Sequence, residues 1–195
     1  MIVYELTRGL AYRGIRHRDM HWYTTTIPLA LTLVGSAAIF WLPSAPALLG
    51  KDGLIATSLA VVATLPGFYF AGLAAVATFN GINMDAVMPA PAAEATVRVG
   101  DARTDVKLSR RQFLSYLFSY LVLVSFAICG VSLLVSAATP SLQLLKSQLT
   151  LYANGGAIWQ VGRTLFIVAY ISAAASMLVT TLHGMFFLTE RIHQP

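Results

Sequence analysis

Four long segments without a charged residue constrain this chain more than any short motif does. They cover residues 20–50, 53–84, 112–145 and 164–189. A helix needs roughly 20 apolar residues to cross a hydrocarbon core about 30 Å thick. A helix on the surface of a soluble protein keeps one polar face, and these segments have none. The sequence therefore predicts an all-α fold, a polytopic membrane protein with four transmembrane helices.

The composition agrees with that prediction. Hydrophobic residues make up 57% of the chain and charged residues 11%, against roughly 25% charged in an ordinary soluble domain. Little chain remains for a soluble domain, so we expect a single membrane domain over residues 1–195. Its predicted parts are a cytoplasmic amphipathic segment (1–22), transmembrane helices at 23–42, 54–79, 112–138 and 163–188, a cytoplasmic loop (80–111), an outer amphipathic helix (140–153) and a cytoplasmic tail (189–195).

The basic residues predict the orientation. One side of the four spans carries Arg8, Arg13, Arg16, Arg18, Arg98, Arg103, Lys107, Arg110, Arg111 and Arg191, and the other carries Lys51, Lys146 and Arg163. Lys and Arg are retained in the cytoplasm, so both termini and the 80–111 loop are expected there. The formal net charge of +5 then reflects topology, and no direct binding of nucleic acid is expected.

The loop between the second and third spans contains a hairpin pattern. Apolar and polar residues alternate on both sides of Gly100-Asp101, which is typical of a short β-hairpin. Ser109 and Gln112 have the spacing of a capping box, which predicts the start of the third span. A lone hairpin is only marginally stable, so we expect a cytoplasmic partner protein to bind this surface. The candidate partner-binding residues are Arg98, Arg103, Lys107, Arg110 and Arg111.

Other features concern the packing of the spans. Pro66 and Gly67 lie in the middle of the second span and predict a kink, because proline removes a helical hydrogen bond. Pairs of small residues one turn apart allow close helix contacts. Packing inside one bundle explains each pair, yet four helices make a thin bundle, so we also expect a homo-oligomer. The helix at 140–153 is expected to lie on the outer membrane face; a re-entrant pore helix is the alternative.

The chain carries little recognisable chemistry. It has no nucleotide-binding loop, hydrolase elbow or paired-cysteine signature, so we expect no enzymatic activity, cofactor or metal. His17 and His21 have a metal-binding spacing, but neighbouring arginines favour two interfacial histidines. His183 is the one titratable residue well inside a span, a candidate for proton passage or pH sensing. The alternative is a neutral His183 that hydrogen-bonds to Thr180 or to a backbone carbonyl.

Two segments carry a family resemblance. Residues 66–79 read PGFYFAGLAAVATF and residues 108–120 read LSRRQFLSYLFSY. With the four-span plan, they resemble the KwaA family, the small membrane subunits of the Kiwa antiphage defence system. That resemblance implies a homo-oligomeric inner-membrane sensor in antiviral defence. It also implies recruitment of a cytoplasmic, DNA-binding partner protein of the KwaB type.

The predicted function is that of a non-enzymatic sensor or scaffold that oligomerises in the lipid bilayer and recruits a cytoplasmic partner. A protein with so little soluble mass acts through its spans or by presenting a surface. The alternative is an oligomeric pore or a membrane-disrupting effector. Such a pore would be lined by hydroxyl side chains, for which the candidates are Thr57, Thr64, Ser115 and Ser119.

Overall fold

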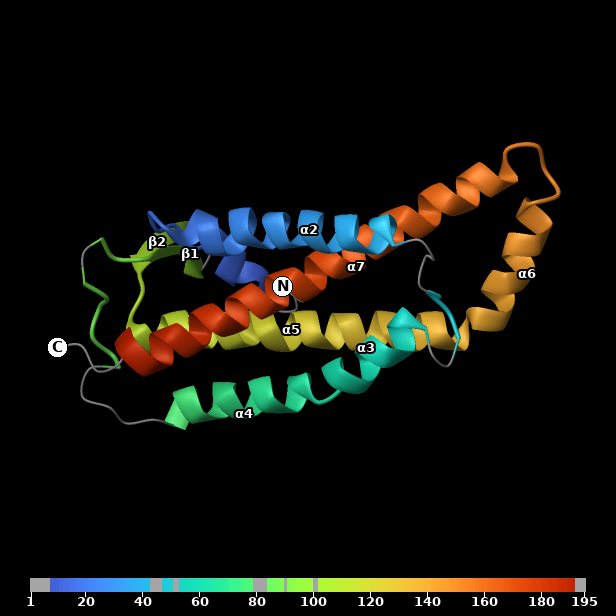
Figure 1. The fold of residues 1–195 in the computed structure, drawn as a ribbon. Helices are drawn as coiled ribbons and strands as arrows, with labels where there is room; N and C mark the ends of the chain where they lie inside the picture. Colours follow the sequence, from blue (N-terminus) through green and yellow to red (C-terminus); the bar gives the residue numbers. More distant parts are fainter. Residues whose placement is uncertain are drawn as a thin grey trace.

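The computed structural model contains four helical segments long and apolar enough to cross a membrane. It describes residues 8–42, 47–50, 53–78, 84–89, 91–99 and 102–191, with the backbone alone at 98, 99, 103 and 191. The four segments are Trp22–Trp41, Leu54–Thr78, Arg110–Ala137 and Gly155–Glu190. They run along one another in an elongated bundle (Figure 1). The prediction of a polytopic, mostly helical membrane protein is confirmed.

The first two spans are each built from two pieces. A π-helical turn (Trp22–Thr26) leads directly into α2 (Ile27–Trp41), and the second span consists of α3 (Leu54–Val62) and α4 (Leu65–Thr78). The break between α3 and α4 lies just before Pro66, which has no N–H to donate to the carbonyl of Val62 and whose ring clashes with that turn. Pro66 and Gly67, the predicted kink residues, therefore stand in the first turn of α4.

Helix α5 (Arg110–Ala137) is the central element of the bundle. The Ser109 side chain accepts from the Gln112 N–H at 3.3 Å, and the Ser109 N–H donates to Gln112 Oε1 at 3.1 Å. The predicted capping box is thus confirmed. Leu114, Leu117 and Leu121 are fully or almost fully buried on α5. This helix packs against α3, α4 and α7 (Gly155–Phe186), which a second π-helical turn (Phe187–Arg191) extends.

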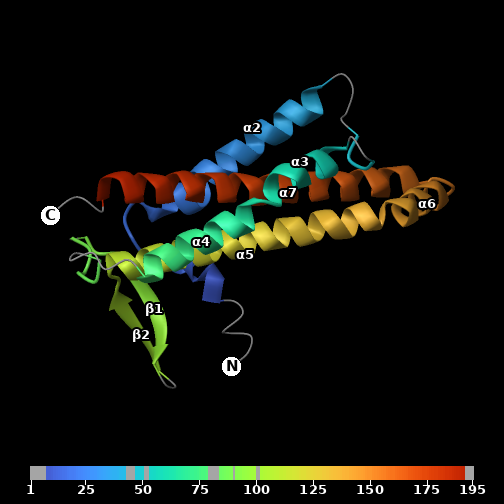
Figure 2. The ribbon, with the colours of Figure 1, turned by 90° about the horizontal axis from the view of Figure 1, so that it is seen from below.

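The predicted hairpin is also confirmed. Strands β1 (Glu94–Val99) and β2 (Ala102–Lys107) pair antiparallel, with Glu94 opposite Lys107 and Val99 opposite Ala102. Figure 2 shows the two strands projecting sideways from the bundle, beside the start of α5. The end of α4 and the end of α7 lie at this same end of the bundle (Figure 1), which we call the hairpin end.

Of the predicted amphipathic segment, residues 1–22, the first seven lie outside the described residues. Residues Arg8–Gly14 form a short 3-10 helix, η1, which packs against α5. Tyr12 is fully buried and Ile15 almost so. A Cβ at Gly9 would lie only 3.1 Å from the Leu123 side chain and 3.2 Å from the Ser119 carbonyl oxygen. Because Gly9 has no side chain, the segment can approach α5 closely, and the burial of Tyr12 stabilises this contact.

At the end of the bundle opposite the hairpin, which we call the far end, helix α6 (Thr139–Leu149) runs between the end of α5 and the start of α7 (Figure 1). It is shorter than the predicted 140–153 helix, and α7 begins at Gly155 rather than at 163. A Cβ on Gly155 would lie 1.6 Å from the Leu149 carbonyl oxygen, so only glycine fits this tight turn. With 32 residues, α7 is about 48 Å long. It therefore extends beyond a hydrocarbon core of about 30 Å.

Candidate functional site

The candidate site surrounds His183, which lies one turn before the end of α7. Its Nδ1 is 3.4 Å from the hydroxyl of Tyr12 on η1. The Tyr23 ring, in the π-helical turn before α2, packs on the imidazole with centroids 4.1 Å apart. The Phe113 ring on α5 lies 5.8 Å from it. His183 therefore joins α7 to η1, to the first span and to α5.

Tyr12 is the buried partner in this cluster. Burial raises the pKa of its hydroxyl far above the ordinary value, and the neighbouring Tyr120 and Tyr23 add to the rise, while a hydrogen bond with Thr180 opposes it. The hydroxyl is therefore neutral near pH 7 and able to donate a hydrogen bond. Thr180, the predicted partner of His183, is thus bonded to the same hydroxyl that reaches the histidine. The Tyr12 and Tyr120 rings stack at 5.4 Å.

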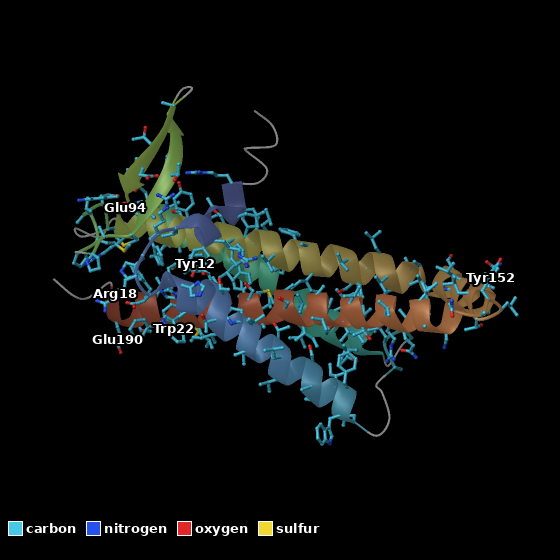
Figure 3. The ribbon with its side chains drawn as sticks, turned by 90° about the horizontal axis from the view of Figure 1, so that it is seen from above. Tyr12, Arg18, Trp22, Glu94, Tyr152 and Glu190 are labelled. Atoms are coloured by element: carbon cyan, nitrogen blue, oxygen red, sulfur yellow. The ribbon has the colours of Figure 1, made fainter. Side chains whose placement is uncertain are left out.

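A small cavity adjoins the cluster. Its volume is about 140 Å³, close to the size of an engineered cavity of about 150 Å³ that binds benzene. His17 and Asp19 line it opposite His183, and the Asp19 N–H donates to His17 Nδ1 at 3.3 Å. Figure 3 places Tyr12 at the end of the bundle that also carries Arg18 and Glu94, opposite the end with Tyr152. The cavity can hold a small molecule or a few waters between the N-terminal segment and α7.

The two histidines with a metal-binding spacing, His17 and His21, do not both line this cavity. Only His17 lines it; His21 is exposed, and both histidines line a separate surface depression together with Arg13, Arg16 and Arg18. Within the described part of the chain, no three His, Cys, Asp or Glu side chains gather closely enough to hold a metal ion.

The five predicted partner-binding residues do not form one exposed surface. Arg110, in the first turn of α5, is only 6% exposed. Arg111 is held by Asp85 through two hydrogen bonds, Nε to Oδ1 at 2.8 Å and Nη2 to Oδ2 at 3.1 Å. Lys107 is exposed. The backbones of Arg98 and Arg103 pair near the outer end of the hairpin, and their side chains lie outside the described residues.

The support expected from a partner comes in part from the chain's own N-terminal segment. Arg16 and Glu94 exchange two backbone hydrogen bonds, at 2.8 and 3.0 Å. The Arg16 side chain also reaches Asp105 on β2, with Nη1 3.1 Å from Oδ2. Arg8 Nη1 donates to the Thr96 carbonyl at 3.3 Å. No short sequence motif can predict these contacts, because Arg8 and Thr96 are 88 residues apart and Arg16 and Asp105 are 89 apart.

Inside the spans, tyrosine hydroxyls join the helices. Tyr170 on α7 lies 2.7 Å from Ser58 Oγ on α3 and 2.9 Å from Ser132 Oγ on α5. Two further pairs, each at 2.7 Å, are Tyr69 with Thr181 and Tyr120 with Ser176.

The predicted pore-lining hydroxyls fall into two separate groups. The hydroxyls of Thr57 and Thr64 donate to carbonyls of their own segment, those of Gly53 and Val61. Ser115 and Ser119 line a different region, beside Arg8. The structure therefore does not bring these four hydroxyls together within one chain.

The His183 cluster brings together α7, η1, the start of the first span and α5. Helix η1 is in turn joined to the hairpin through Arg8. The sequence pointed to His183 but not to Tyr12, Tyr23 or Phe113 as its neighbours. The only feature of these three residues that could have indicated the site was an aromatic side chain near the end of a span.

Neither a protein-family model, a curated protein sequence nor a solved structure matches this chain.

Proposed function

We propose that this protein is a non-enzymatic sensor or scaffold subunit of the bacterial inner membrane, which oligomerises and presents its hairpin end to a cytoplasmic partner. The observation that carries the proposal is the hairpin itself, whose base is hydrogen-bonded to the N-terminal segment while its outer half projects from the bundle (Figure 2). A surface fixed in this way is preorganised, which lowers the entropy cost of binding a partner.

The proposed orientation places the hairpin end in the cytoplasm. Ten of the 13 Lys and Arg residues belong to segments at that end, and positive charge is retained on the cytoplasmic side. The start of the first span and the end of the fourth lie at this end of the bundle, together with the hairpin (Figure 1). An even number of spans requires such an arrangement.

The proposed signal route runs from the spans to the hairpin. His183 stands on α7 and contacts Tyr12 of η1, and the same segment continues to Arg16, which pairs with Glu94. A shift of α7 relative to α5 would change these contacts, and would move the hairpin base with them. The resemblance to the Kiwa membrane subunits supports an antiphage role with a DNA-binding partner of the KwaB type.

The test is co-purification of the full-length protein from its native host in mild detergent, with mass spectrometry of the bound proteins. We expect a soluble partner in stoichiometric amounts on a homo-oligomer. Arg103→Glu, at the outer part of the hairpin, should release that partner. Lys146→Glu makes the same change of charge on α6, at the far end, and should retain it.

Two results would contradict the proposal. One is a partner that remains bound equally to both variants. The other is a homo-oligomer without a partner that releases ions from liposomes, which would assign the protein to the pore-forming class.

A further inference from the structure

A second cavity at the hairpin end has a very different lining from the one beside His183. It lies between η1 and the first turns of α5 and has a volume of about 440 Å³. Its polar lining residues are Arg8, Arg111, Gln112, Ser115, Tyr116 and Ser119. The two cavities share no lining residue. We propose that this second cavity binds the phosphate group of an anionic phospholipid.

The charge of the lining favours an anion. Two guanidinium groups face the cavity, and among the described residues that line it there is no carboxylate. Asp85 neutralises part of the Arg111 charge, but its side chain is 75% exposed and does not line the cavity. The remaining groups are hydroxyls and an amide, which donate hydrogen bonds to phosphate oxygens.

Both arginines are held in place before any ligand arrives. Arg8 donates to the Tyr116 hydroxyl, and its guanidinium carbon lies 4.9 Å from the centre of the Tyr116 ring. Arg111 donates to Asp85 and, through Nη1, to the Ala77 carbonyl at 3.0 Å. A guanidinium fixed in this way loses little entropy when it binds a phosphate.

The length of α5 leaves room for the cavity outside the hydrocarbon core, where lipid phosphates lie. Arg111, Ser115 and Ser119 recur every fourth residue, so they share one face of α5 and span about 12 Å along it. The 28 residues of α5 measure about 42 Å, longer than a hydrocarbon core of about 30 Å. The first turns of α5 therefore fit the headgroup region.

The same face of α5 continues into apolar side chains. Leu123 follows Ser119 by one turn, and Phe126, 55% exposed, follows by two. A phosphate bound beside Ser115 and Ser119 would thus leave its acyl chains on an apolar helix surface. This continuity favours a lipid over a soluble phosphate compound. η1 lies against α5 on the side from which the hairpin projects (Figure 2).

The test measures binding of phosphatidylglycerol and phosphatidylcholine to the purified full-length protein by native mass spectrometry. We expect one saturable phosphatidylglycerol site and about tenfold weaker binding for Arg8→Gln. Ser115→Leu fills the cavity without changing the charge and should weaken binding to a similar extent. Arg13→Gln is the matched control, since Arg13 is exposed on the same η1 helix outside this cavity. It should change the Kd less than twofold.

Competition with glycerol 3-phosphate distinguishes the two sources of phosphate. Displacement of the lipid at millimolar concentration supports a site that accepts the phosphate from either source, and failure to displace it supports a lipid site. The elution volume and the melting temperature of each variant establish that it is folded. Equal losses in Arg8→Gln and Arg13→Gln, no loss in either, or undiminished binding by folded Ser115→Leu would overturn the proposal.

Discussion

Removing the hydroxyl of Tyr170 tests whether polar pairs hold the spans together. Ser58 Oγ donates to the Ile55 carbonyl at 3.0 Å. In each of the two pairs that Tyr170 makes, with Ser58 and with Ser132, either hydroxyl can be the donor. One tyrosine hydroxyl therefore links α7 to both α3 and α5. Tyr170→Phe removes both links and deprives the fully buried Ser132 hydroxyl of its partner on α7.

The expected cost follows from measured hydrogen bonds between membrane helices. These average about 0.6 kcal/mol each, with a maximum near 1.7 kcal/mol. Two links therefore contribute about 1.2 kcal/mol to the free energy of unfolding, with an upper limit of about 3.4 kcal/mol. Ser132→Ala removes one link and should cost about 0.6 kcal/mol. The double variant should be less destabilised than the sum of the two single variants, because both remove the same bond.

The assay is unfolding in mixed micelles, followed by the loss of helical signal as SDS is added. Tyr152→Phe is the matched control, because Tyr152 is exposed at the far end (Figure 3) and its hydroxyl makes no hydrogen bond within the described part of the chain. It should leave the free energy of unfolding unchanged. The reasoning is refuted if Tyr170→Phe behaves like Tyr152→Phe, or if the coupling energy with Ser132→Ala lies below about 0.2 kcal/mol.

Three further predictions concern the two ends of the bundle. Gly155→Ala should lower the melting temperature strongly, because its Cβ would lie 1.6 Å from the Leu149 carbonyl oxygen; calorimetry of the detergent-solubilised protein measures this. The pKa of Tyr12 is higher in the folded than in the unfolded protein, so stability should fall as pH rises above about 10. The fall should be smaller in Tyr12→Phe when both are followed by circular dichroism. The Arg16–Asp105 pair is exposed, with side chains 73% and 46% accessible; Asp105→Asn should cost under about 1 kcal/mol, and less in high salt.

Several elements could be predicted from the sequence because their causes are local. A span needs a continuous stretch of apolar residues without charge, which is visible residue by residue. The capping box of Ser109 and Gln112 joins two residues three positions apart, and the hairpin strands are adjacent in the chain. Each of these depends on neighbours along the chain, so their residue types and spacing were enough.

The bounds of the far-end helices were harder to predict. The sequence predicted an outer helix over 140–153 and a fourth span over 163–188, yet α6 ends at Leu149 and α7 starts at Gly155. The missing Cβ of Gly155 allows close approach to Leu149, and this is a property of the folded turn. Arg163, the first residue of the predicted span, therefore stands inside α7 rather than at its start.

The sequence by itself determined that the chain is a four-span helical membrane protein with a small hairpin. Only the tertiary structure decided which polar groups meet. His183 and Tyr12 are 171 residues apart, and Tyr170 and Ser58 are 112 apart. The rotation of each helix about its axis fixes such contacts, and that rotation depends on how all the helices pack together. The burial of Arg110 and the attachment of the hairpin to Arg16 have the same origin, since neither residue type nor spacing encodes a partner so distant in the chain.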